Sequence, residues 1–135
     1  MKNTKWLLLL HNRTVLLERR PSIGLWGGLW TFPEARAVMD VADYCRRHFG
    51  CEVCASRKIK PVEHGFTHFR LRVSPMLCEI GSVTPRAESA GRLWMDIEEA
   101  QGAAVPAPVK KLLNWLASAR SRQETSDAWS VDATK

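Results

Sequence analysis

The sequence predicts an α/β (α+β) fold in which a mixed β-sheet is flanked by helices within a single domain. Short apolar runs of strand-like composition alternate along the chain with amphipathic stretches of helical period. The length of 135 residues suits one domain with its own hydrophobic core. We expect this domain to cover residues 1–120, and the polar residues 121–135 to form a disordered tail.

The first half of the chain is predicted to begin with a β-hairpin. Two apolar runs, Lys5–His11 and Arg13–Glu18, are separated by a short turn. A loop covers Arg19–Gly28, because a proline and three glycines interrupt it. Leu29–Phe32 then predicts a short strand that ends at the next proline. Val38–Phe49 places its apolar residues on one stripe and is followed by a glycine, which predicts a helix.

The second half is predicted to complete the sheet and to close with a helix. Glu52–Val62 and Phe66–Glu79 are expected strands on either side of a turn, and Arg92–Met95 is a third. Asp96–Glu99 has the spacing of a capping box and opens a brief helical turn. After Pro106 a helix is indicated by apolar residues at helical spacing, namely Val109, Leu112, Leu113 and Leu116. The predicted order is therefore β-β-β-α-β-β-β-α.

Charge and hydropathy narrow the class of protein. The longest apolar run, Trp6–Leu10, is too short to cross a bilayer or to act as a signal sequence, so we expect a cytoplasmic protein without a membrane partner. The formal net charge is +6, and a positive charge of this size favours polyanions over acidic partners. Nucleic acid is the polyanion that this composition suggests first.

The four cysteines give no sign of a disulfide framework or a metal site. Cys51 and Cys54 form a lone C-x-x-C, whereas a structural zinc site needs a second close pair of Cys or His. On a strand, residues three apart also face opposite sides, which hinders shared coordination. We therefore expect Cys45, Cys51, Cys54 and Cys78 to be reduced, partly buried thiols, and no metal to be bound.

The segment GLWGGLWTFPE, at Gly24–Glu34, is the first of two informative motifs. Gly28 and Glu34 match the first two fixed positions of the Nudix hydrolase signature, G-x5-E-x7-R-E-U-x-E-E-x-G-U, where U is aliphatic. The glutamates of that signature hold magnesium, a hard cation that requires oxygen ligands. Continued without a gap, the R-E-U-x-E-E positions hold Ala42, Asp43, Tyr44, Cys45, Arg46 and Arg47.

Basic residues thus occupy the positions of the signature at which a divalent metal needs carboxylates. A register shifted by one residue aligns Gly50, but it then places Arg47 and His48 at the paired-glutamate positions. Because arginines repel magnesium, the sequence predicts a Nudix-type frame without pyrophosphate hydrolysis. In the alternative interpretation the motif is only a tight turn whose tryptophans fill the core. The two interpretations are compatible.

The second motif, HGFTHF at His64–Phe69, lies in the most basic part of the chain. Between residues 57 and 72 a single acid, Glu63, faces the basic residues Arg57, Lys58, Lys60, Arg70 and Arg72. If Phe66–Val73 is a strand, alternation places Phe66, His68, Arg70 and Arg72 on one face, and Thr67, Phe69, Leu71 and Val73 on the other. The first face would suit phosphates, although a solvated basic face on an amphipathic strand is the simpler alternative.

Together these motifs resemble the C-terminal, Nudix-like domain of A/G-specific adenine DNA glycosylases of the MutY type. The resemblance rests on L-L-E-R-R-P-S-I-G-L-W-G-G-L-W-T-F-P-E at Leu16–Glu34, on H-G-F-T-H-F, and on the closing W-M-D…A-V-P-A-P-V-K-K-L-L pattern. It extends from about Lys5 to Leu116. The resemblance implies base excision repair: recognition of 8-oxoguanine opposite adenine by a parent enzyme that hydrolyses the N-glycosidic bond of the mispaired adenine.

The resemblance also implies what this chain lacks and what it binds. The family's catalytic residues and iron–sulfur cluster belong to an N-terminal domain, and the cysteines here do not match the cluster pattern C-x6-C-x2-C-x5-C. We therefore expect no cofactor in this chain and no glycosylase activity from it alone. The implied partners are double-stranded DNA with an A·8-oxoguanine mispair and the N-terminal catalytic domain. The protein is expected to be a monomer in a bacterial cytoplasm, acting at the nucleoid.

The family's F-S-H or F-T-H recognition turn falls on Phe66, Thr67 and His68. In 8-oxoguanine N7 carries a proton, so the Thr67 hydroxyl would accept from N7–H while a backbone N–H donates to O8. Phe66 would stack or wedge against the base step, and His68 would bond a phosphate or support the turn. Arg70 joins this lesion-binding group, and expected DNA backbone contacts are Arg19, Arg20, Lys58, Lys60 and Arg72.

Two other functions compete with this one. An active Nudix hydrolase on oxidised nucleoside triphosphates would need a magnesium-binding carboxylate cluster, which the motif does not supply. A Nudix-like scaffold that binds protein and has no role with nucleic acid would give DNA binding that is blind to the lesion, or none.

Overall fold

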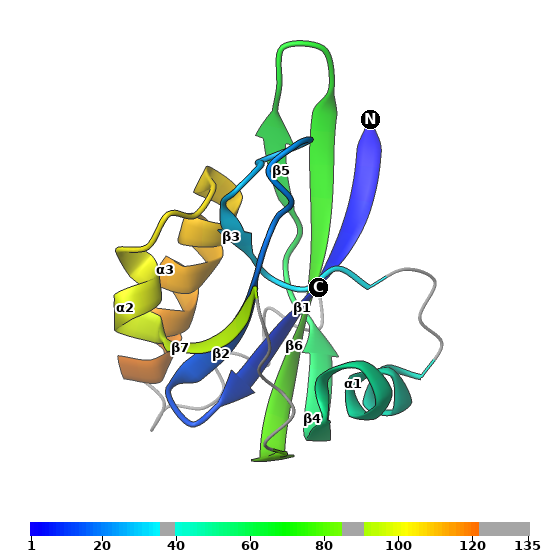
Figure 1. Cartoon of the computed structure of the whole chain (residues 1–135), viewed down its shortest axis with the longest axis vertical. Coiled ribbons are helices and arrows are strands. Elements are labelled where there is room, and N and C mark those ends of the chain that lie inside the picture. Colours follow the sequence, from blue (N-terminus) through cyan, green and yellow to red (C-terminus); the bar gives the residue numbers. More distant parts are fainter. Residues whose placement is uncertain (36–39, 85–90, 122–135) are drawn as a thin grey trace.

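A mixed sheet of seven strands forms the centre of the computed structural model, which describes residues 1–35, 40–84 and 91–121 (Figure 1). Five strands follow the order β3-β2-β1-β6-β4, while β7 pairs with β2 and β5 pairs with β6. The strands are β1 (Lys2–His11), β2 (Thr14–Arg19), β3 (Trp30–Thr31), β4 (Cys51–Lys58), β5 (Val62–Gly65), β6 (Arg70–Val83) and β7 (Arg92–Asp96). Among the strand pairs of the described residues, β1 with β6 is parallel and the others are antiparallel. The predicted α+β fold is thereby confirmed.

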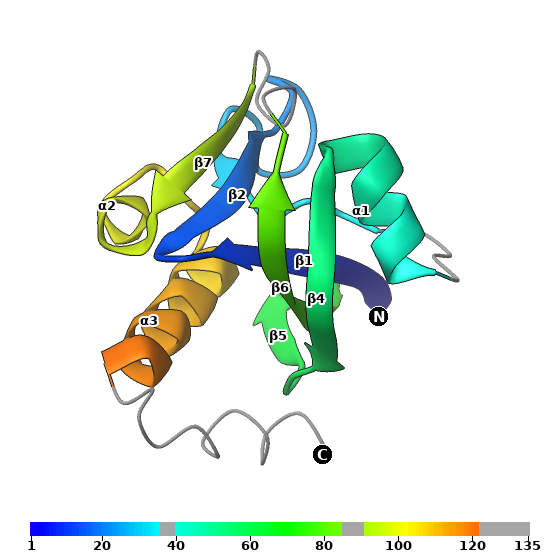
Figure 2. The ribbon, with the colours of Figure 1, turned by 90° about the horizontal axis from the view of Figure 1, so that it is seen from below.

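Strand β1 is apolar on both of its faces because helices cover both sides of the sheet. Leu8 and Leu10 point into the core beneath α2 and α3, whereas Leu7 and Leu9 point into the core beneath α1. Figure 2 shows α2 and α3 on one side of the strands and α1 on the other. An unbroken run of leucines is what a central strand with two covered faces requires.

The two C-terminal helices, α2 (Ile97–Gln101) and α3 (Ala107–Ser121), confirm the predicted helical turn and the helix after Pro106. Asp96 caps α2, because its side chain accepts a hydrogen bond from the Glu98 N–H at 2.9 Å. The buried stripe of α3 consists of Val109, Leu112, Leu113 and Leu116, as the spacing predicted. No helix in the described ranges is long and apolar enough to cross a membrane. Residues 122–135 of the predicted tail lie outside the described residues.

Helix α1 (Val41–Phe49) begins three residues later than the predicted start at Val38. Asp40 has an extended backbone, and its side chain accepts a hydrogen bond from the Asp43 N–H at 3.1 Å, so it is the N-cap. Val38 itself lies outside the described residues. Gly50 ends the helix in the left-handed conformation, with φ 63°, as the sequence suggested.

The strand predicted over Glu52–Val62 is divided into β4 and β5. Both strands pair with the same edge of β6, and the three residues 59–61 form a bulge opposite the two residues Ser74 and Pro75. Pro75 has no N–H to donate to that edge, and only its carbonyl accepts, from the Ile59 N–H at 3.1 Å. Pro61 inside the predicted strand and Pro75 on the partner strand both lack an N–H, and together they account for the division.

The ends of three other strands also differ from the prediction. Strand β1 starts at Lys2 rather than Lys5, because its first residues pair in parallel with β6. Strand β3 contains only Trp30–Thr31. Strand β6 starts at Arg70 rather than Phe66, and residues 66–69 form the connection between β5 and β6. The β1–β2 hairpin is confirmed, and Asn12 at φ 56° supplies its turn.

Candidate nucleic-acid interface

The FTH turn, Phe66–Phe69, joins β5 to β6 and forms the end of the hairpin that extends from the sheet (Figure 1). Gly65 and Arg70 are the last paired residues, and the Phe66 N–H donates to the Phe69 carbonyl at 2.7 Å. Thr67 and His68 are exposed at its tip. Within the described part of the chain, neither their side chains nor their N–H groups form a hydrogen bond. These polar groups are available to a ligand.

Beneath the tip, the two phenylalanines of the turn belong to an aromatic cluster. The rings of Phe66 and Phe69 stack with centroids 4.7 Å apart, so the prediction that they face opposite sides of a strand was wrong. The reason is that the chain turns here instead of continuing as a strand, and alternation begins only at Arg70. The ring of His64 lies 4.7 Å from that of Phe66, and the Lys2 Nζ lies 4.9 Å from the centre of the Phe69 ring.

Trp26 supports the turn from the loop between β2 and β3. Its ring centroid lies 5.5 Å from that of Phe66, 6.0 Å from His64 and 5.9 Å from Trp6 on β1. Trp26 is half-buried and has φ 55°, a left-handed conformation that is strained for a bulky residue. Such strain persists only where surrounding contacts determine the conformation, and the aromatic cluster supplies these contacts.

The loop around Trp26 is shaped by two glycines. A Cβ on Gly27 would come within 2.4 Å of the Ser22 carbonyl oxygen, so no larger residue fits there. Gly28 has φ 79°, and its N–H approaches the carbonyl oxygens of Arg20 and Pro21 at 3.2 and 3.1 Å. The motif therefore forms a tight turn that holds a tryptophan against the FTH turn.

Glu34, the acidic residue of the Nudix-like motif, is engaged by groups of the protein itself. The Thr4 hydroxyl donates to one of its carboxylate oxygens, and an Arg20 Nη lies 3.8 Å from the other. The cavity beside it, which Trp6 and Trp26 also line, has a volume of about 40 Å³. Space of this size holds about one water molecule.

Helix α1 carries arginines where the Nudix signature has metal ligands. Arg46 pairs with Glu52 at 3.2 Å and with Asp43 at 3.6 Å, and Arg47 pairs with Asp43 at 3.0 Å. The hydrogen bond to Glu52 raises the pKa of Arg46, so the guanidinium remains protonated and positively charged. Among residues 1–35, 40–84 and 91–121, no three His, Cys, Asp or Glu side chains are grouped so that they could hold a metal ion.

Three of the four cysteines are buried beneath α1. Cys45, Cys51 and Cys78 belong to the core on that face of the sheet, and Cys54 is exposed on β4. The contact with Cys51 lowers the pKa of Cys45, but hydrogen bonding to Cys78 and burial outweigh it and raise the pKa to about 12. A hydrogen bond to Cys45, together with burial, raises the pKa of Cys51.

The basic residues predicted to contact DNA differ in how far the protein neutralises them. Arg70 and Arg72 both pair with Glu63, at 3.6 and 3.1 Å. Arg20 pairs with Glu34, and the Arg19 Nε donates to the Gly28 carbonyl at 3.3 Å. Lys58 and Lys60, by contrast, are exposed and form no ion pair with a described residue.

Two contributors to this site were missed by sequence reasoning. Trp26 was interpreted only as a residue that fills the core, and Lys2 was not considered. The signal for Trp26 was its position between glycines in a motif that precedes the turn by some forty residues. No local pattern connects Lys2 to the turn, because the parallel pairing of β1 with β6 brings it there.

This fold and the altered motif define a Nudix domain. A model of the NUDIX domain family matches residues 5–115, and the chain belongs to that family. Among curated proteins it is similar to the adenine DNA glycosylase of Buchnera aphidicola subsp. Baizongia pistaciae (strain Bp), with 20% identity over 124 residues. That match covers 91% of this chain and 35% of the glycosylase, so the chain spans about a third of its relative.

Solved structures agree on the fold. The C-terminal domain of mouse MUTYH, in a crystal structure of its complex with human PCNA, superposes with a TM-score of 0.69 at 20% identity, covering 90% of each chain. NrtR of Shewanella oneidensis superposes with a TM-score of 0.74 at 11% identity, covering 91% of this chain and 64% of its own. At these identities the two superpositions show a shared fold.

Proposed function

We propose that this chain recognises 8-oxoguanine opposite adenine in DNA, as the C-terminal domain of an adenine DNA glycosylase of the MutY type that works in base excision repair. The observation that carries the proposal is the FTH turn, where Thr67 is exposed with unused polar groups above a stacked aromatic cluster. The similarity to adenine DNA glycosylase and to the MUTYH C-terminal domain supports this MutY-type role in DNA repair.

The chemistry of the turn suits the oxidised base. Guanine presents acceptors at N7 and O6, whereas 8-oxoguanine presents a donor at N7 and a new acceptor at O8. The Thr67 hydroxyl accepts from N7–H, and an unused N–H of Thr67 or His68 donates to O8. With unmodified guanine the N–H meets a C–H and is left without a partner, and the hydroxyl must turn its own proton toward N7 instead of donating it elsewhere. Such a mismatch costs about 1–3 kcal/mol.

Removal of adenine is assigned to the parent enzyme. The chain spans about a third of the curated glycosylase. The resemblance implies that the catalytic residues and an iron–sulfur cluster belong to an N-terminal domain of such enzymes. On this proposal the isolated chain has no glycosylase activity and acts, as a monomer, on DNA in the bacterial cytoplasm.

The alternative, a hydrolase of oxidised nucleoside triphosphates, has less support. The positions of its metal ligands carry Arg46 and Arg47, both already paired with carboxylates. The cavity beside Glu34 is far below the 300–1,000 Å³ typical of pockets for small molecules.

Replacing the hydroxyl of the turn tests the proposal. Binding of the chain to duplexes with A·8-oxoguanine and with A·G gives its base preference as a ratio of Kd values. We expect Thr67→Ala to lower that ratio roughly ten-fold, because about 1.4 kcal/mol of discrimination is lost with the hydroxyl. Thr67→Ser keeps the hydroxyl and should retain the preference.

An equal preference in the wild type and in Thr67→Ala would show that the turn is not the reader. Release of phosphate or pyrophosphate from 8-oxo-dGTP by the chain with magnesium would instead support the hydrolase. Release of adenine by a pure sample would contradict the assignment of catalysis to another domain.

A further inference from the structure

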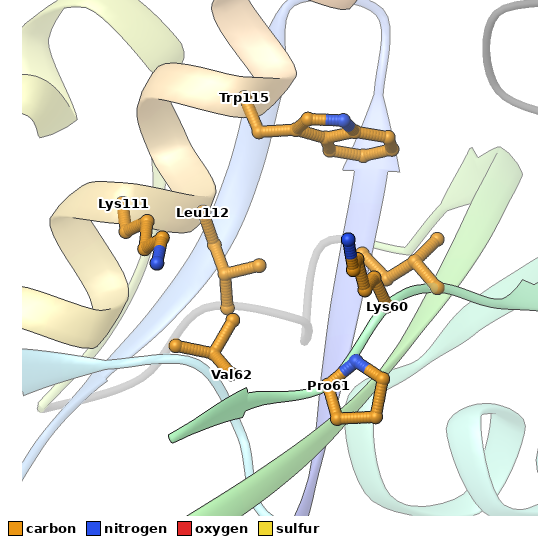
Figure 3. A pocket seen from close by; sticks show the side chains of 7 residues that line it. Lys60, Pro61, Val62, Lys111, Leu112 and Trp115 are labelled. Carbon is orange, nitrogen blue, oxygen red and sulfur yellow. The ribbon is translucent and has the colours of Figure 1, made fainter. Parts of the chain in front are cut away.

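A second site lies along β5 from the FTH turn. A pocket of about 380 Å³ opens between α3 and the bulge that separates β4 from β5 (Figure 3). Val62, Leu112 and Trp115 belong to its apolar lining, and Lys60 and Lys111 line it from two different elements. This lysine pocket, defined by these five residues, comes together only in the fold, because Lys60 and Lys111 are far apart in sequence.

The positive charge of the lysine pocket is not neutralised by the protein. No acidic residue is among those that line it, and neither Lys60 nor Lys111 forms an ion pair within the described residues. The neighbouring Arg72 contrasts with them, because Glu63 holds it at 3.1 Å. Two unpaired ammonium groups that converge on one pocket attract an anion more strongly than paired arginines do.

Strand β5 connects the lysine pocket to the FTH turn. Val62 lines the pocket and begins β5, which ends at Gly65, and Thr67 follows two residues later. At about 3.3 Å per residue, the five residues from Val62 to Thr67 span at most about 17 Å. The phosphates of one DNA strand follow one another at about 3.4 Å along the helix axis, so this span corresponds to about five base-pair steps. DNA held at Thr67 can therefore reach the pocket.

The apolar wall suits a sugar–phosphate backbone. Figure 3 shows the indole ring of Trp115 across the pocket from Lys60 and Pro61. A wall of this kind excludes water from one side of the ammonium groups, which strengthens their attraction to a phosphate. It also offers the carbon atoms of a deoxyribose an apolar surface. An acidic peptide would meet the same charges, but the position of the pocket at the start of β5, whose other end carries the FTH turn, favours DNA.

We propose that the lysine pocket binds the backbone of the DNA that flanks the lesion, with Lys60 and Lys111 each contacting a phosphate. This inference rests on the proposed function. Contacts to phosphates position a protein on DNA and carry no base information, so the pocket contributes affinity and the turn contributes preference.

The salt dependence of DNA binding by the full chain tests this division. We expect the double variant Lys60→Ala, Lys111→Ala to bind an A·8-oxoguanine duplex about ten-fold more weakly at about 100 mM salt. Because each phosphate contact contributes about 0.9 to the slope of log K against log[salt], the slope should fall by about 1.8. The preference for 8-oxoguanine over guanine should stay unchanged. Lys110→Ala is the matched control, because Lys110 is exposed beside Lys111 but does not line the pocket.

A double variant with the slope and Kd of the wild type would overturn the inference. Poly-L-glutamate serves as a probe for acidic proteins. A double variant that binds DNA normally but no longer binds poly-L-glutamate would also overturn the inference, because the pocket would then bind an acidic protein. If Thr67→Ala loses preference while the double variant is normal, only the pocket fails. The wild-type chain could instead show no base preference while the double variant still has a reduced salt slope. That result would contradict the proposed reader at the turn but support the pocket. Absence of any DNA binding at about 50 mM salt overturns both.

Discussion

The segment that matches the Nudix signature has two halves, and they have different roles in this chain. The first half, Gly24–Glu34, keeps a tight glycine-dependent turn and holds Trp26 against the FTH turn. The second half, helix α1, contacts the sheet through Cys45 and Phe49 and carries arginines in place of metal ligands. The loop therefore contributes to a candidate site, whereas the helix contributes only to the core.

This difference shows that the two tasks of the signature are physically separable. In the hydrolase signature the glutamates of the helix supply carboxylates to magnesium. Here the shape of the loop depends on Gly27 and Gly28, whose geometry requires no metal. Arg46 and Arg47 suit the helix for local reasons, since basic residues in the last turn complement the helix dipole and Asp43 pairs with both.

Of the variants that test the different roles of the loop and the helix, Trp26→Ala should have the largest effect. We expect Trp26→Ala to lower the free energy of unfolding by about 2–3 kcal/mol, because a half-buried indole is lost from the aromatic cluster. The preference for 8-oxoguanine should fall roughly ten-fold as the FTH turn loses its support. Urea unfolding measures the first effect, and paired duplexes measure the second.

Two variants separate support of the turn from general stability. Trp26→Phe keeps an aromatic ring beside Phe66 and should retain most of the preference. Tyr44→Ala removes a half-buried ring from helix α1, so it should lower stability but leave the preference unchanged. If Tyr44→Ala reduced the preference as much as Trp26→Ala, the two halves would not differ in function.

A smaller effect on stability is expected at Glu34, the last residue of the loop half of the signature. Glu34→Gln keeps an acceptor for the Thr4 hydroxyl but loses the ion pair with Arg20, which is partly exposed. We expect the free energy of unfolding to fall by only about 0.5–1 kcal/mol. Magnesium should not raise the Tm of either protein, because a bound metal would stabilise the folded state by mass action. A rise in the wild type that Glu34→Gln abolishes would identify a metal site and contradict the comparison.

Most of the fold could be predicted because the responsible signals are local. The leucine run of β1, the apolar stripe of α3 and the glycine after α1 each specify an element within a few residues. Some errors arose where a distant residue contributes. Pro61 was a local signal for the division of the strand predicted over Glu52–Val62, whereas the contribution of Pro75 is recognised only once β6 is paired.

The same distinction applies to the candidate site. The FTH motif located the turn, because its residues are contiguous. Its support could not be predicted, since Trp26 and Lys2 reach Phe66 and Phe69 through loop packing and parallel strand pairing. The partners of Arg70 and Arg72 likewise depend on the β5–β6 register, which places Glu63 opposite Arg72.

The smallest expected effect concerns the buried thiols of α1 and of the strands beneath it. It tests whether helix α1 contributes only to the core. The pKa of Cys45 is raised from 9.0 to about 12, so at pH 8 its thiol is protonated and unreactive. We expect iodoacetamide at pH 8 to modify only the exposed Cys54, giving one adduct by mass spectrometry, and Cys54→Ser to give none. Between pH 9 and pH 12 the unfolded chain loses the Cys45 proton while the folded chain keeps it, so stability should decline as pH rises. Adducts on Cys45 at the rate of Cys54 would mean that α1 opens readily, and the helix half would then have a dynamic role that its packing does not suggest.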